Sequence, residues 1–151
     1  MKYFLITILF LLLTNGCSTK NAYSEFEMSD EEELITTYTQ SSKIKNKDGV
    51  IGIMNGVYIN NTDKVYFDDL EHFLVSIYMK DQNENYNFKL NKKIPIAVKE
   101  LEDIKEFSTY IKNPKKWEKH YIVSFKKSGK TLNLILENKG SDLSVLRFKK
   151  F

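Results

Sequence analysis

The fold is encoded most clearly in residues 121–148, which read YIVSFKKSGKTLNLILENKGSDLSVLRF. Apolar residues alternate with polar ones in three runs, separated by two turn-like segments: Tyr121–Phe125, Leu132–Leu136 and Leu143–Phe148, with Lys127–Lys130 and Asn138–Asp142 between them. Alternation with period two is typical of strands that bury one face, and short links that contain glycine are typical of hairpins. We therefore predict a three-stranded antiparallel meander at this end of the chain.

The same alternation continues upstream and predicts further short strands at 34–39, 50–59, 65–67, 73–79, 86–90 and 94–98. Gly52 and Gly56 inside the second of these runs predict a bulge, a bend or a break. The segment Lys99–Lys112 has apolar residues near helical spacing and is stopped by Asn113 and Pro114. The expected fold is mainly β: an antiparallel β-sandwich, Ig-like or related, of about seven to nine strands, with one short helix near 99–112.

The N-terminal segment carries the one cysteine of the chain, Cys17. Lys2 supplies a positive charge, Tyr3–Leu13 is an apolar run, and residues 14–16 lead directly into Cys17. This order is typical of a secretory signal. A cysteine in place of the small-residue cleavage site resembles the lipobox of bacterial lipoproteins. The resemblance implies that residues 1–16 are a signal peptide and that Cys17 becomes lipidated, with palmitate or a similar acyl chain also on its amine in many bacteria.

Lipidation would decide where the protein is located. Each buried acyl CH₂ contributes about 0.8 kcal/mol, so two or more chains hold a protein durably on a bilayer. Ser18 after the cysteine resembles lipoproteins that are sorted to the outer membrane of Gram-negative cells. The expectation is a lipid-anchored protein of the bacterial cell envelope. The alternatives are an ordinary signal peptide that contains a cysteine and an uncleaved anchor, although the apolar run is shorter than the roughly 18 residues that a span requires.

The mature chain divides into a tether and one domain. Residues 17–33 form a lipidated N-terminus and acidic tether in this interpretation, and 34–151 form a single β-sandwich domain. Ser29 and Glu32 have the spacing of a capping box, so a short helix is the alternative at the end of the tether. The net charge of +3 and the isoelectric point near 8.8 are too mild to indicate nucleic-acid binding.

Residues that carry catalytic or metal-binding chemistry are sparse. The two histidines are His72, expected in a turn at a strand entry, and His120, expected at a sheet edge. Acidic pairs occur at Asp68 and Asp69 and at Glu102 and Asp103, which are expected to be solvated. Neither a nucleophile elbow nor a phosphate-binding loop is present in the sequence. We therefore predict a protein that is not an enzyme and that has no metal or cofactor.

The aromatic residues give the remaining indication of function. Tyr110, Trp117 and Tyr121 alternate with lysines around Pro114 and are a possible exposed interface. The favoured alternative for Trp117 is a plug at one end of the core. These observations favour a non-enzymatic envelope lipoprotein that binds a protein partner or serves as an accessory module. A lipid-anchored inhibitor or immunity protein, with a loop at Asp81–Asn85, is the alternative. A carrier of a hydrophobic ligand is a further alternative, which requires a deep apolar cavity.

Overall fold

The computed structural model describes residues 29–62, 69–81, 85–111 and 114–150, which form strands with little helix. Cys17, the expected strand at 65–67 and Asp68 lie outside the described residues. The elements are, in chain order, α2 (Asp30–Tyr38), β1 (Thr39–Asn46), β2 (Gly49–Tyr58), the 3₁₀ turn η2 (Ile59–Asn61), β3 (Leu70–Met79), β4 (Asn87–Leu90), β5 (Ala97–Glu100), the 3₁₀ turn η4 (Lys105–Phe107), β6 (Glu118–Lys126), β7 (Thr131–Asn138) and β8 (Ser141–Lys149).

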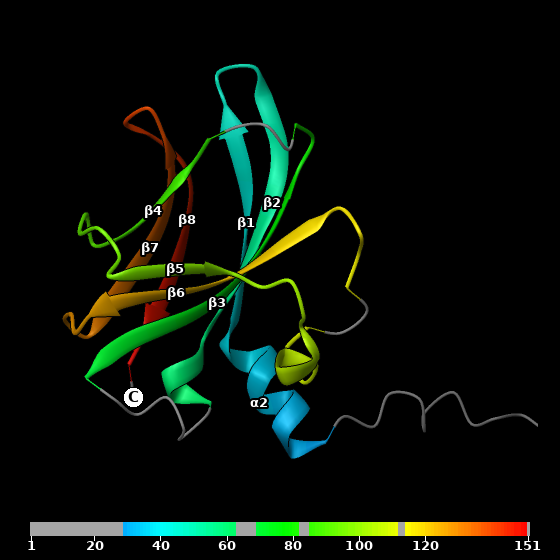
Figure 1. Ribbon diagram of the computed structural model, residues 1–151. Coiled ribbons are helices and arrows are strands. Elements are labelled where there is room, and N and C mark those ends of the chain that lie inside the picture. Colours follow the sequence, from blue (N-terminus) through cyan, green and yellow to red (C-terminus); the bar gives the residue numbers. More distant parts are fainter. Residues whose placement is uncertain (1–28, 63–68, 82–84, 112–113, 151) are drawn as a thin grey trace, which may run out of the picture.

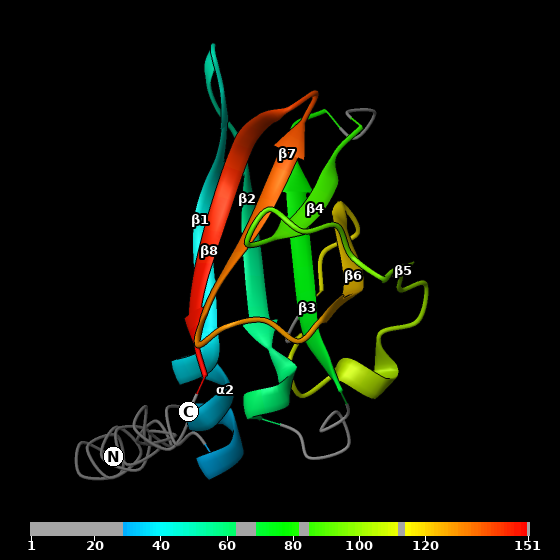
Figure 2. The same cartoon turned by 90° about the vertical axis from the view of Figure 1, so that its left-hand side faces the viewer.

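The strands form two antiparallel sheets that face each other (Figure 1). Sheet A has five strands in the order β1-β2-β3-β6-β5, and sheet B has three in the order β4-β7-β8. Figure 2 shows sheet B in front of sheet A, with β8 beside β1 at one side and β5 lying away from sheet B at the other. The prediction of a mainly β, antiparallel, sandwich-like fold is confirmed.

Alternating apolar side chains fill the space between the sheets. Large side chains from both sheets that are almost fully buried include Phe73, Phe125, Leu134 and Leu146. Along the side where β1 meets β8 the sheets approach closely, because Gly56 lies under sheet B: an added Cβ there would come within 2.6 Å of Leu146 Cδ1. The expected bulge is also found, since the register between β1 and β2 shifts beside Gly52, although β2 is one continuous strand.

The first predicted strand, 34–39, is wrong, because residues 34–38 complete the helix α2 and β1 begins only at Thr39. Ser29 Oγ accepts a hydrogen bond from the Glu32 amide, and the Glu32 carboxylate accepts one from the Ser29 amide. Four acidic residues in the first turn also interact favourably with the positive end of the helix dipole. Local capping therefore outweighs the strand preference of the β-branched residues in this segment. The described secondary structure begins at Asp30, before residue 34.

The predicted meander has the right strands but the wrong pairing. β7 and β8 pair as expected, whereas β6 lies in sheet A between β3 and β5. Residues 127–130 therefore cross from one sheet to the other and are not a hairpin turn. The Ser128 amide donates to Glu71 Oε1 at 2.8 Å, and Asn91 Nδ2 donates to Ser128 Oγ at 2.9 Å. These long-range bonds replace the cross-strand bonds of a hairpin.

Glu71 ties this crossover to both sheets. Its side chain is about 1% exposed and also accepts hydrogen bonds from the Tyr58 hydroxyl, at 2.5 Å, and from Lys150 Nζ. Lys150 Nζ donates to the Ser128 carbonyl at 2.8 Å as well, so the residue that follows β8 is joined to β3 and to the crossover. Burial and the Glu71 carboxylate both raise the pKa of Tyr58, which keeps the hydroxyl a donor.

The segment 99–112 contains less helix than predicted. Its first two residues belong to β5, and η4 is a single 3₁₀ turn. The apolar residues of the segment nevertheless cover the outer face of sheet A, where Phe107 and Ile111 pack with Leu74. The apolar residues at helical spacing thus do form one buried side of this segment, although the segment is mostly irregular.

Candidate functional site

Sheet A extends beyond sheet B on the side opposite the β1–β8 contact. β4, the outer strand of sheet B, lies over β6: the Phe88 and Tyr121 ring centroids are 5.6 Å apart. β5 is the next strand of sheet A after β6, and no strand of sheet B lies above it in the described chain. The inner face of sheet A is consequently uncovered along β5.

Two valines show where the cover ends. Val98 on β5 and Val123 on β6 are register partners, so their side chains point to the same face of sheet A. Val123 is 0% exposed, whereas Val98 is 47% exposed. Ile96 and Ile94, just before β5, are 52% and 77% exposed. An uncovered apolar row therefore leads into and along β5.

Trp117 is a further exposed apolar residue of sheet A, six positions before Val123 and just before β6. Its side chain is 53% exposed and borders a depression of only about 10 Å³ with Ile77, Met79 and Tyr86. The favoured interpretation of Trp117 as a core plug is therefore wrong: the indole packs beside the end of the core and leaves half of its surface in solvent. We call Ile94, Ile96, Val98 and Trp117 together the open side.

The other two aromatic residues of the predicted interface lie elsewhere. Tyr121 is buried on the inner face of sheet A, and Tyr110 packs with the residues that cover the outer face, where its hydroxyl lies 3.1 Å from Thr62 Oγ1. The structure does not bring Tyr110, Trp117 and Tyr121 together. Trp117 and Tyr121 are four positions apart on the same face of sheet A, but Tyr121 packs under β4 and Trp117 does not, and the loop after Leu101 takes Tyr110 to the outer face.

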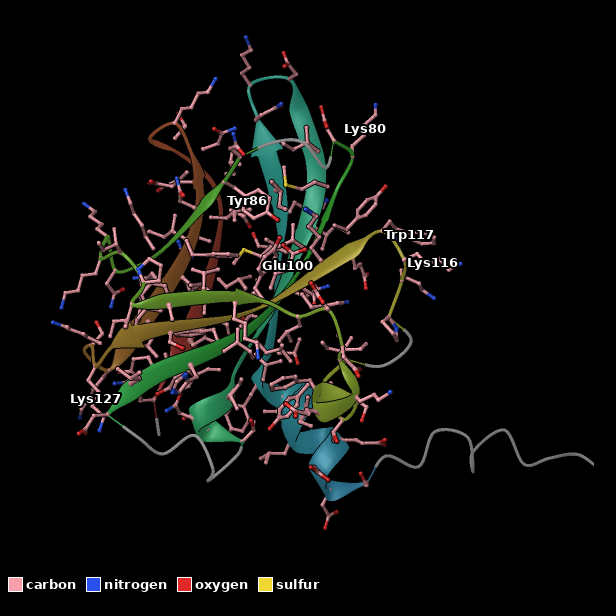
Figure 3. The ribbon with its side chains drawn as sticks, viewed as in Figure 1. Lys80, Tyr86, Glu100, Lys116, Trp117 and Lys127 are labelled. Carbon is pink, nitrogen blue, oxygen red and sulfur yellow. The ribbon has the colours of Figure 1, made fainter. Side chains whose placement is uncertain are left out.

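Tyr86 and Tyr121 form the wall between the core and the open side. Their hydroxyls are 2.7 Å apart and their rings meet edge to face. Burial raises the pKa of both tyrosines, and the nearby Glu100 carboxylate adds to the effect, so both hydroxyls stay neutral. In Figure 3 Glu100 lies between Tyr86 and Trp117, and Lys116 and Lys80 lie at the Trp117 end. The exposed apolar residues of the open side are therefore accompanied by charged ones.

β5 also presents an unpaired backbone edge. The Leu101 amide donates to the His120 carbonyl, so Ala97, Lys99 and Leu101 turn their backbone groups toward β6. Val98 and Glu100 alternate with them and turn their amides and carbonyls away from β6. Pro95 has no amide hydrogen and the Ile96 amide donates to Ser124, which limits the free edge to a short stretch.

The two histidines lie inside sheet A. His72 is within β3, and its Nδ1 lies 2.9 Å from Ser124 Oγ; His120 is within β6, and its Nδ1 lies 2.8 Å from Ser76 Oγ. Both histidines are buried, and β6 is flanked on both sides, so the expected turn and edge positions are wrong. Each imidazole serves a cross-strand hydrogen bond. Burial lowers the pKa of His120, and the Glu118 carboxylate opposes this shift.

The acidic pairs do not gather into a site. Asp69 forms an exposed ion pair with Lys127 at 2.9 Å, and Asp103 forms one with Lys105 at 3.5 Å. Among the residues that the structure describes, no three His, Cys, Asp or Glu side chains come close enough together to hold a metal ion. In the same part of the chain, no helix has the length and hydropathy needed to cross a membrane.

Compared with protein families, curated proteins and solved structures, the chain has no match. The open side must therefore be interpreted from its own chemistry. Sequence reasoning missed Ile94, Ile96 and Val98 as surface residues, because their alternation resembles that of a buried strand. Pro95 was the available signal, since proline within a strand pattern indicates an edge.

Proposed function

We propose that this protein is a non-enzymatic, lipid-anchored protein of the bacterial cell envelope that binds another protein chain through its open side. Two independent features support the proposal. The leader that ends at Cys17 resembles that of lipoproteins, and the described domain has an uncovered apolar surface beside an unpaired strand edge. Anchoring at Cys17 attaches the chain at the end of the domain that carries α2.

The observation that carries the binding role is the exposure of Ile94, Ile96 and Val98 in and just before β5, with Trp117 exposed farther along the same sheet. Protein interfaces combine apolar and aromatic residues with polar ones, and both kinds are exposed on the open side. A free strand edge offers main-chain hydrogen bonds to an extended segment, while exposed side chains beside it provide specificity. Here Ile96 and Val98 lie next to that edge. The open side is thus suited to a partner that contributes a strand.

The other two functions considered have less support. A carrier of a hydrophobic ligand requires a cavity between the sheets, but that space is occupied by large side chains such as Phe73, Phe125 and Phe148. Two clefts formed by the described residues, of about 440 and 290 Å³, lie at the surface beside residues 99–106 and between α2 and β8. The inhibitor or immunity role rested on a loop whose residues 82–84 lie outside the described residues.

Photo-cross-linking in native envelopes tests the binding role. A photoreactive residue placed at position 96 should give a discrete protein adduct, whereas the same residue at position 50 should not. Val50 is a matched control, because it is 56% exposed and lies on the β1–β2 hairpin, away from β5. Equal adducts at both positions, or none at position 96 in folded protein, would exclude a specific partner on the open side.

Anchoring is tested separately with the Cys17→Ser variant. The wild-type chain should be found in the membrane fraction with acyl label on its N-terminal cysteine, and Cys17→Ser should lose both the label and the membrane association. A mature membrane-bound protein with an unmodified Cys17 would contradict the lipoprotein assignment. It would leave the binding role of the open side to be judged on the cross-links alone.

A further inference from the structure

The two ends of β5 carry opposite charges. Lys92 and Lys93 precede the strand, whereas Glu100, Glu102 and Asp103 lie at its end and just beyond it, and all five side chains are exposed. A second β5 in antiparallel orientation would bring its acidic end beside this basic end, and its basic end beside this acidic end. Parallel alignment would place like charges together. The charge pattern of β5 is therefore complementary to itself in the antiparallel orientation.

We propose that the chain which binds the open side is a second copy of this protein, with the two β5 strands paired antiparallel about a two-fold axis at Val98. This proposal deepens and rests on the proposed protein-binding role. It assigns an isologous contact, in which each copy provides the same residues. The five-stranded sheets of the two copies would then continue into each other across the contact.

The backbone of β5 favours this register. The outward-facing amide and carbonyl of Val98 would bond those of the second Val98. This alignment places Val98 against Val98 and Lys99 against Ala97. Moving the axis to Lys99 would put two lysines directly opposite each other, which is unfavourable. The Val98-centred register thus satisfies both the backbone and the side chains.

The position of β5 suits two copies on one membrane. In Figure 1 β5 runs across the molecule and α2 lies at the lower end, and in Figure 2 β5 is seen nearly end-on beside sheet A. The two-fold axis of an antiparallel strand pair is perpendicular to the local sheet, so it runs toward the end that carries α2. Both α2 helices would then lie at the same end of the pair. Attachment to one bilayer would also raise the local concentration of a short, weak edge contact.

Disulfide formation in the membrane-bound protein tests the register. In a hydrogen-bonded antiparallel pair the two Cα atoms are about 5.5 Å apart, which is within the range for a disulfide. Full-length protein with Val98→Cys should therefore give a covalent dimer in envelopes under mild oxidation. The matched control, Val50→Cys, and the wild-type chain should stay monomeric. In the Val98→Cys background, Lys93→Glu or Asp103→Lys should each lower the dimer yield several-fold, and the two together should restore it.

The outcomes separate this proposal from the proposed function. A Val98→Cys protein that is folded and membrane-bound but yields no dimer would overturn the second-copy proposal, as would equal dimer from Val50→Cys. A discrete adduct at position 96 with the mass of a different protein would overturn it too, while leaving the binding role intact. Loss of membrane association in the wild-type chain would instead contradict the anchoring part of the proposed function.

Discussion

Val98 and Val123 lie opposite each other on neighbouring strands, yet one is half exposed and the other is fully buried. The residue type and the face of sheet A are the same at both positions, although β6 is an inner strand of the sheet and β5 is its edge strand. The difference is the cover: β4 lies over β6, and no described strand of sheet B lies over β5. Exposure of the open side is therefore a consequence of five strands facing three, and it is the feature on which the proposed binding role rests.

The hydrogen-bond network around Glu71 contrasts with the open side, because its groups are polar and buried, whereas the open side is apolar and exposed. Around Glu71, buried polar groups from β2, β3, the crossover and the C-terminal Lys150 all find partners. This network fixes how the chain passes between the sheets, and its groups are largely removed from solvent. Changes there should affect stability, whereas changes on the open side should affect binding.

The largest effect is expected from Val123→Asp. An unpaired carboxylate in the core should lower the free energy of unfolding by more than about 4 kcal/mol, which is enough to unfold many domains. Val98→Asp should change it by less than about 0.5 kcal/mol, because the side chain reaches solvent. Urea denaturation followed by circular dichroism measures both. Similar losses in the two variants would show that β5 is covered.

Lys150→Met should have the next largest effect. It leaves the buried Glu71 carboxylate without its cation, and removing one partner from such a pair costs about 3–5 kcal/mol. We expect about 3 kcal/mol, because Lys150 keeps a quarter of its side chain in solvent. Lys149→Met, at the exposed neighbouring position, is the control. If the two variants were equally stable in urea, the Glu71 network would not hold the crossover.

Gly56→Ala tests how tightly the sheets close on the other side. Its Cβ would meet the Leu146 side chain at 2.6 Å, so the sheets must shift or Leu146 must move, at a cost of about 1–3 kcal/mol. Gly129→Ala is a matched change in open space, with nothing within 4 Å of the added atom. A thermal melt of the two variants compares them. Equal melting temperatures would show that β2 and β8 pack less closely at Gly56 than the structure indicates.

Alternation in the sequence predicted the strands better than it predicted their partners. The runs at 73–79, 121–125, 132–136 and 143–148 all lie within observed strands, because one side of each is buried. The link at 127–130 has hairpin chemistry, but its partners Glu71, Asn91 and Lys150 come from distant parts of the chain. Local patterns contain no record of such contacts, so the crossover was unpredictable.

The open side was hidden for a related reason. Val98 and Val123 both lie in alternating apolar runs, and their difference in burial follows from the number of strands in the facing sheet. The exposure of Trp117 was unpredictable for the same reason, since it depends on where sheet B ends. The start of helix α2, in contrast, is indicated by the capping box of Ser29 and Glu32, which are only three positions apart in the sequence. Features set by local hydrogen bonds are thus accessible to sequence reasoning, and features set by sheet width are not.

The smallest effect concerns pH. Because burial lowers the pKa of His120, the unfolded chain binds a proton near pH 6.5 more readily than the folded one does. The free energy of unfolding should therefore decrease as the pH falls below about 6.5 and level off below the folded-state pKa. His120→Gln should remove this part of the pH dependence in urea denaturation. An unchanged profile in the variant would assign the dependence to other groups.

The fluorescence of Trp117, the one tryptophan of the chain, tests the central claim most directly. The account places this indole on an uncovered side of a folded domain. Emission from the purified, folded protein at low concentration should therefore be red-shifted and strongly quenched by iodide, and Trp117→Ala should leave the unfolding transition nearly unchanged. Blue-shifted emission that iodide does not quench would show that the side is covered, and would contradict the account.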